Sequence, residues 1–76
     1  MKILMSNPEF EKLWKVYNDY LMESHGMILN FKEKQDRLNE LDILSKNDIE
    51  MAIEILEIMI ANGETTIKMP NANEFA

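Results

Sequence analysis

The chain has 76 residues, no cysteine and a formal net charge of −6. A chain of this length has room for one hydrophobic core, so residues 1–76 are expected to form a single domain. The lack of cysteine excludes disulfides and thiolate metal sites as sources of stability, which leaves close helix packing or association with other chains.

The first predicted helix covers about residues 8–25. Asn7 before Pro8 is typical of a helix start, because the Asn side chain accepts from free backbone N–H groups and proline is preformed for the first helical position. Gly26 supplies the left-handed residue that ends the helix. His25, the only histidine, is interpreted as a partner for the last carbonyl groups of the helix rather than as a general base. Apolar side chains recur at helical spacing and predict a core-facing stripe: Phe10, Leu13, Trp14, Tyr17 and Leu21.

The second predicted helix covers about residues 31–44. Asn30 and Glu33, three residues apart, form the pattern of a capping box. Lys34 and Gln35 fall within the apolar arc, which makes this helix the least amphipathic of the three. The residues expected to face inward are Phe31, Leu38 and Leu41.

The third predicted helix covers about residues 46–62. Ser45 with Asp48 repeats the capping pattern, Ile49 opens the apolar part of the helix, and Asn62 and Gly63 close it. Its apolar residues span an arc of about 220° at ~100° per residue, roughly twice what one surface helix needs. We therefore expect this helix to be central or to lie at an oligomer interface. The core face is Ile49, Ala52, Ile53, Leu56 and Ile60, and the expected interface with other copies is Met51, Ile55, Ile58 and Met59.

Two segments outside the helices, residues 1–5 and 65–69, have strand-like composition. Each could pair with the other, with a copy in another subunit, or with nothing. Residues 70–76 are expected to form a frayed tail. The predicted fold is thus all-α or mostly α, a small three-helix domain with short terminal segments that are candidates for strands.

The sequence contains no motif for catalysis or for cofactor binding. Both glycines are explained as helix ends, so no glycine-rich loop remains to hold a phosphate. One histidine without any cysteine supplies neither a nucleophile–base pair nor a carboxylate–histidine metal set. Residues 47–67 contain no Lys or Arg, so the third helix cannot serve as a recognition helix on DNA. We expect no catalytic residue, no cofactor, no metal and no sequence-specific DNA binding.

The negative charge is concentrated in one part of the chain. Residues 1–37 contain six acids and six bases, whereas residues 38–64 contain seven acids and only Lys46, which accounts for the whole net charge of −6. Such a segment attracts a basic partner, although solubility alone would also explain it. Three of these carboxylates share one side of the third helix and form the expected acidic face towards the partner: Glu50, Glu54 and Glu57.

These patterns favour a non-enzymatic, acidic interaction protein. We expect a homo-oligomer, a homodimer or larger, that binds and modulates or inhibits a partner protein, including by imitating nucleic acid with its carboxylates. The abundance of Ile, Asn, Lys and Met suggests an A/T-rich genome, and with it a phage or plasmid accessory protein acting on a host factor. The alternative is a protein that sequesters a small anionic or nucleotide-like ligand between subunits, held by Lys12, Lys15 or Arg37 and stacked on Tyr20.

A cytoplasmic location without membrane contact is expected. No apolar run approaches the ~18 residues that a membrane span requires. Residues 1–5 are followed by Ser6, Asn7 and Pro8, too soon for the apolar part of a signal peptide. If a phage encodes the protein, the location is the host cytoplasm.

Overall fold

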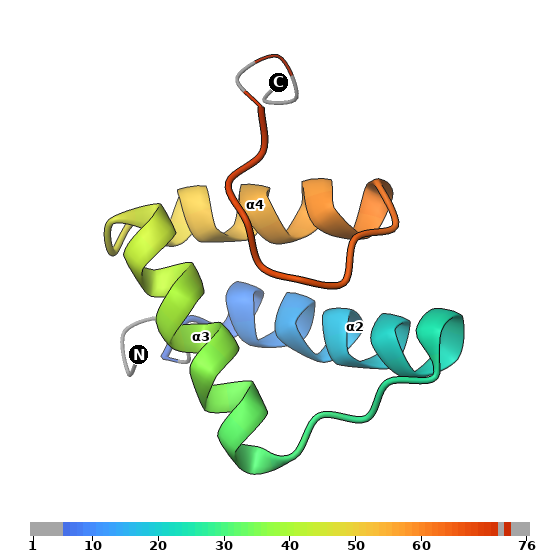
Figure 1. Ribbon diagram of the computed structural model, residues 1–76. Coiled ribbons are helices and arrows are strands. Elements are labelled where there is room, and N and C mark those ends of the chain that lie inside the picture. Colours follow the sequence, from blue (N-terminus) through green and yellow to red (C-terminus); the bar gives the residue numbers. More distant parts are fainter. Residues whose placement is uncertain (1–5, 72, 74–76) are drawn as a thin grey trace.

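A computed structural model describes residues 6–71 and residue 73 of the chain. Within these residues the chain forms three helices, α2 (Pro8–His25), α3 (Phe31–Ser45) and α4 (Ile49–Ala61), as the sequence predicted (Figure 1). No strand occurs within the described residues, so the candidate strand at residues 65–69 pairs with nothing in the single chain, which is one of the three outcomes left open by the sequence. The other candidate strand, residues 1–5, lies outside the described residues.

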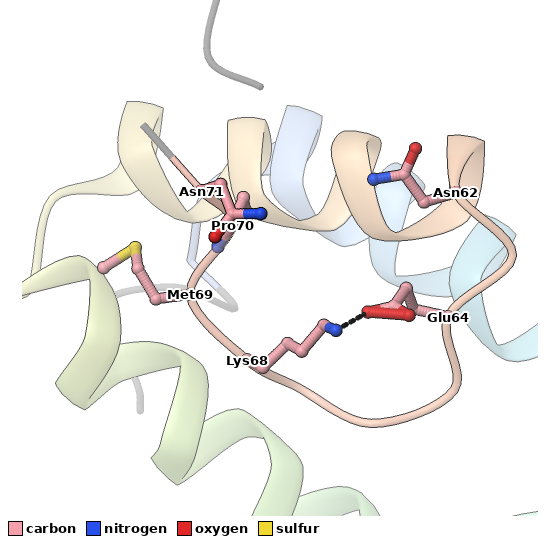
Figure 2. A pocket seen from close by; sticks show the side chains of 6 residues that line it. All are labelled: Asn62, Glu64, Lys68, Met69, Pro70 and Asn71. Carbon is pink, nitrogen blue, oxygen red and sulfur yellow. Dashed lines mark ion pairs between the residues drawn. The ribbon is translucent and has the colours of Figure 1, made fainter. Parts of the chain in front are cut away.

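After α4 the chain continues as an extended segment, which we call the C-terminal strap (residues 64–71). Gly63 has a φ of 72°, a left-handed conformation that turns the chain back past α2 and α3 before it crosses α4 (Figure 1). Within the strap, Lys68 forms an ion pair with Glu64 (Figure 2). The strap therefore meets all three helices, although it has no regular secondary structure of its own.

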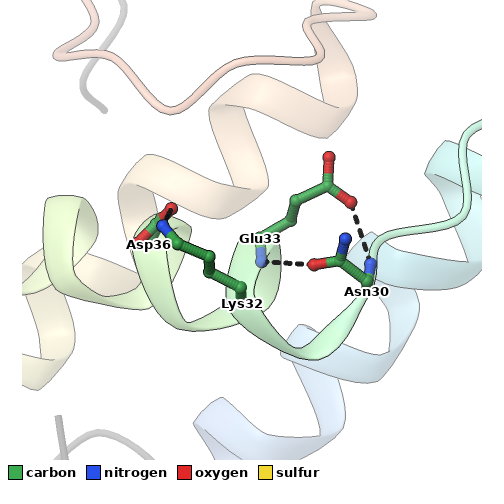
Figure 3. Close-up of polar contacts among 4 residues, drawn as sticks. All are labelled: Asn30, Lys32, Glu33 and Asp36. Carbon is green, nitrogen blue, oxygen red and sulfur yellow. Dashed lines mark hydrogen bonds and ion pairs between the residues drawn. The ribbon is translucent and has the colours of Figure 1, made fainter.

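The ends of α2 and the start of α3 are formed as the sequence predicted. Asn7 Oδ1 accepts a hydrogen bond from the Phe10 N–H at 3.0 Å, and Gly26 ends α2 with a φ of 64°. At the start of α3, the Asn30 side chain accepts from the Glu33 N–H at 2.8 Å (Figure 3). The Glu33 carboxylate accepts in return from the Asn30 N–H at 2.9 Å, which completes the capping box (Figure 3).

The turn between α3 and α4 differs from the prediction. Ser45 does not cap α4; it is the buried last residue of α3, and its hydroxyl donates to the Asp42 carbonyl at 3.3 Å. Lys46 and Asn47 follow with φ values of 55° and 64°, so both occupy the left-handed region. Asp48 is the actual N-cap, accepting from the backbone of the first turn, and α4 consequently begins at Ile49. The left-handed residues Lys46 and Asn47 separate the two helices, so Asp48 and not Ser45 lies at the N-cap position of α4.

The core forms around α4, because α2 and α3 both pack against this helix. Of the two positions expected for the third helix, the structure shows the central one. Phe31 was expected to face inward but is 78% exposed, since it opens α3 at the end of the helix that extends beyond the core. The buried apolar side chains are Phe10, Trp14, Tyr17, Leu21, Leu29, Leu38, Leu41, Ala52, Ile55, Leu56, Met59 and Ile67.

The strap completes this core. Ile67 and Pro70 are both buried, and they cover apolar surface that three helices alone would leave exposed. Pro70, the first residue of the expected frayed tail, is thus part of this cover. The wide apolar arc of α4 is explained by contact with two helices and the strap within one chain.

Candidate functional site

The acidic edge of α4 consists of Glu50, Glu54 and Glu57. Glu50 and Glu57 are exposed and Glu54 is half-buried. All three lie on the side of α4 opposite its four buried residues, Ala52, Ile55, Leu56 and Met59. None of the three carboxylates forms a hydrogen bond or an ion pair with any residue that the structure describes. The edge is thus a row of unpaired carboxylates directed away from the core.

The expected oligomer interface does not form a single exposed surface. Ile55 is 0% exposed and Met59 is 1% exposed within the single chain, so both belong to the core, which corrects their assignment. Met51 and Ile58 are half-buried and flank the acidic edge. Only these two of the four predicted interface residues remain available to a partner.

A network of polar side chains holds the strap against α2 and α3. The Tyr17 hydroxyl donates to the Thr65 carbonyl at 3.0 Å and accepts from Arg37 Nη1 at 2.8 Å. Arg37 also donates to the Thr65 carbonyl. Burial raises the pKa of the Tyr17 phenol, and the neighbouring Arg37 guanidinium opposes this rise. Arg37, predicted as a possible ligand-binding cation, is therefore engaged in holding the fold together.

Tyr20 and His25 form a second anchor of the strap. The Tyr20 hydroxyl donates to the Glu64 carbonyl at 2.9 Å and lies 2.9 Å from His25 Nε2. Because the hydroxyl has a single proton, His25 Nε2 must donate in this pair. His25 thus binds a tyrosine hydroxyl instead of the helix carbonyls expected from the sequence. Tyr20, predicted to stack on a ligand, is half-buried and contributes to the fold.

The strap and the end of α4 surround an open pocket of about 570 Å³ (Figure 2). The single acid and the single base in its lining form the ion pair between Glu64 and Lys68. The other lining residues are Asn62, Met69, Pro70 and Asn71. This lining contains no histidine and no free carboxylate, so it has no side chain suited to general acid–base chemistry.

No group of three His, Asp or Glu side chains among the described residues lies close enough together to hold a metal ion. Comparison with protein-family models, with curated proteins and with solved structures found no match for the chain. Over the part of the chain that the structure describes, no helix is both long and apolar enough to span a membrane. The function has to be inferred from the surface chemistry.

Sequence reasoning found the acidic edge but missed two other features. It did not predict that Tyr17 and Arg37 both bind the Thr65 carbonyl, because Thr65 lies 48 residues after Tyr17 and 28 residues after Arg37. It also did not predict that Lys12 and Lys15 lie beside Trp14 and Lys34 at one hollow between α2 and α3. The sequence did suggest Lys12 and Lys15 as ligand-binding cations, but together with Tyr20 and not with Trp14, and it marked Lys34 only as a charge within an apolar arc.

Proposed function

We propose that this chain is a non-enzymatic binding protein that docks the acidic edge of α4 on a basic surface of a partner protein and modulates or inhibits that partner. The observation that carries the proposal is the row of three unpaired carboxylates at Glu50, Glu54 and Glu57. Complementary charge would speed the encounter with a basic surface and fix the orientation of docking.

The acidic edge carries a cost that the fold alone does not require. Glu54 follows Glu50 by four residues and precedes Glu57 by three, and like charges at these spacings destabilise a helix by ~0.2–0.5 kcal/mol per pair. A lysine at position 54 would instead pair with both neighbours. Because α4 is the central helix of a small domain, three repelling carboxylates are better explained by a partner than by folding.

Two further elements belong to this proposal. Met51 and Ile58 supply half-buried apolar surface next to the carboxylates, and we propose them as the remaining contact residues between copies in a homo-oligomer. The composition supports a phage or plasmid accessory protein acting on a host factor in the cytoplasm. Imitation of nucleic acid is the narrower version, in which the edge occupies a groove that normally binds phosphates.

A capture experiment from the lysate of the native host tests the proposal. The wild-type chain is compared with a triple variant of the acidic edge, Glu50→Gln, Glu54→Gln and Glu57→Gln. A matched control makes the same charge change at exposed acids elsewhere: Glu9→Gln, Glu23→Gln and Glu40→Gln. We expect the wild type and the control to retain the same partner at low salt, and the edge variant to lose it.

The salt dependence separates the versions of the proposal. Binding through the acidic edge should weaken steeply as salt increases, whereas binding through Met51 and Ile58 should not. A partner that the edge variant and the control retain equally would contradict the proposal and leave solubility as the role of the charge. If the partner is a nucleic-acid-binding protein, competition by duplex DNA distinguishes imitation of nucleic acid from binding elsewhere.

A further inference from the structure

A hollow of about 420 Å³ lies between α2 and α3, away from the acidic edge. It includes no residue of α4. Its lining has six residues of α2, which are Glu11, Lys12, Trp14, Lys15, Asn18 and Asp19, and one residue of α3, which is Lys34. Its volume lies within the ~300–1,000 Å³ range of small-molecule sites. Since it shares no residue with the acidic edge, the two sites can be tested separately.

Three lysines around the hollow have unpaired side chains. The ammonium groups of Lys12, Lys15 and Lys34 form no ion pair or hydrogen bond with any described residue. In contrast, Lys32 of the same helix α3 pairs with Asp36 at 3.1 Å (Figure 3). Three lysines from two helices therefore line one space, and none of them is paired with the two acids in the same lining, Glu11 and Asp19.

Lys34 is the most informative of the three. It is half-buried and lies on the inward arc of α3, four residues before the buried Leu38 and seven before the buried Leu41. Its half-buried side chain brings a positive charge to the place where α2 and α3 line the hollow, and an anion bound there would pair with it.

Trp14 gives the hollow an aromatic component. It packs between Phe10 and Tyr17, with ring centroids 6.2 and 5.3 Å away, so its indole is firmly positioned. Its Nε1–H has no hydrogen-bond partner among the described residues. This nitrogen is not completely buried, so it can donate to a ligand at the surface. Asn18 Nδ2 donates to the Trp14 carbonyl at 2.8 Å, which leaves Asn18 Oδ1 free to accept.

We propose that this hollow binds a small organic monoanion with a flat apolar or aromatic body. The anionic group is held by Lys12, Lys15 and Lys34, and the apolar body packs against Trp14. Three bases and the two rim acids, Glu11 and Asp19, give the lining a net charge of +1. This balance suits one negative charge and disfavours a polyanion such as nucleic acid.

Nuclear magnetic resonance provides a direct readout, because Trp14 is the only tryptophan and gives a single indole N–H signal. Phenylacetate is the probe, phenylacetamide is its neutral isostere, and adenosine monophosphate, whose phosphate carries close to two negative charges at neutral pH, tests the preference for a single charge. We expect phenylacetate to shift the Trp14 signal saturably and the neutral amide to bind at least roughly tenfold more weakly. We expect adenosine monophosphate to bind more weakly than phenylacetate, because the lining suits one negative charge.

Substitution of single lysines tests the site itself. Lys34→Gln should weaken phenylacetate binding roughly tenfold, because it removes one charged contact while keeping most of the side-chain stem. Lys32→Gln is the matched control, with the same charge change on the same helix but outside the hollow, and it should leave binding unchanged. Lys12→Gln, at an exposed position, repeats the test without a risk to folding.

Three results would overturn the inference. The first is the absence of a saturable shift with any probe. The second is an equal response to inorganic phosphate alone, which would indicate a nonspecific anion effect. The third is a loss of affinity in Lys32→Gln as large as that in Lys34→Gln, which would show that overall charge and not the hollow governs binding.

Discussion

Tyr17 joins three parts of the chain through one hydroxyl group. Its ring is fully buried between Trp14 and Tyr20 on α2, while its hydroxyl meets Arg37 of α3 and the Thr65 carbonyl of the strap. The carbonyl of half-buried Thr65 accepts from both donors, and hydrogen bonds of this kind contribute about 1 kcal/mol each to stability. A polar group in the core therefore determines where the strap lies.

We expect Tyr17→Phe to lower the free energy of unfolding by about 1 kcal/mol, because the hydrogen bond to Thr65 is lost while Arg37 still donates to the same carbonyl. Urea unfolding followed by circular dichroism measures the change. Tyr20→Phe is the comparison, and its loss should be smaller because Tyr20 is only half-buried. A larger loss in Tyr20→Phe would show that Tyr17 is not the main anchor.

The same residue predicts a dependence on alkaline pH. Burial raises the pKa of the Tyr17 phenol above its ordinary value of 10.0, so the folded chain holds this proton more tightly than the unfolded chain. The resulting stability is fully present below about pH 10 and is lost as the pH rises through the raised pKa. Between about pH 9 and about pH 11, the unfolding free energy should therefore fall more steeply in the wild type than in Tyr17→Phe. Parallel curves for the two proteins would contradict this.

At the scale of elements, α4 places in different environments two side chains that the sequence predicted in one interface. Ile55 and Ile58 were both expected at an oligomer interface, yet Ile55 is completely buried and Ile58 is half-buried. Ile55→Glu should unfold the domain, because it places an unpaired carboxylate in the core. Ile58→Glu should keep the helical signal and convert the proposed homo-oligomer to a folded monomer.

Light scattering combined with circular dichroism on both variants and the parent measures these outcomes. A parent that is monomeric at micromolar concentration would contradict the proposed association. An Ile55→Glu variant with the full helical signal would contradict the burial of Ile55. Ile43→Glu provides a control for a new charge on the surface, since Ile43 is 75% exposed on α3.

The helices were predictable because their signals are local. Caps such as Asn7 and Asn30 act within one turn, and the apolar periodicity needs only neighbouring residues. The rotation of α4 about its own axis was not predictable in the same way. The centre of its buried residues lies about 60–70° around the helix from the centre of the predicted core face, which is less than one residue step of ~100°. Helical spacing does not encode the return of the strap, which brings Pro70 to the same small cavity as Ile58 and Met59 of α4.

The candidate sites show the same contrast. The acidic edge lies within one helix, so the spacing of Glu50, Glu54 and Glu57 was enough to place the three carboxylates on one side. The hollow at Trp14 requires α2 and α3 to meet at a particular angle, and no sequence spacing encodes this angle. Lys34 was noticed only as an exception to the apolar pattern of α3.

At the scale of the whole molecule, the acidic edge and the unpaired lysines lie on different helices, and the strap supplies part of a small core. The acidic edge lies on α4, while the unpaired lysines Lys12, Lys15 and Lys34 lie around the hollow formed by α2 and α3. A domain of 76 residues has a total stability of only about 4–11 kcal/mol, at ~0.05–0.15 kcal/mol per residue. Each part of the core that the strap supplies is therefore a substantial fraction of the whole.

Ile67 provides the test at this scale. Ile67→Ala should lower the free energy of unfolding by about 2–3 kcal/mol and the melting temperature by about 10–20 °C, because it removes the main buried side chain of the strap. Thermal unfolding followed by circular dichroism measures both. Thr66→Ala, at the exposed neighbouring position, should have little effect. Equal melting temperatures for the wild type and Ile67→Ala would show that the strap does not contribute to the core.

The strap's contacts also determine which of its residues can be substituted without changing its path. Tyr17, Tyr20 and Arg37 all bind backbone carbonyls of the strap, at Glu64 and Thr65, and a carbonyl is the same whatever side chain accompanies it. Only the positions of Ile67 and Pro70 require a particular kind of side chain for burial. A strap held in this way can accumulate substitutions at its exposed positions while its path across the helices stays the same. Two distant copies of this domain could then share the path of the strap and very little of its sequence.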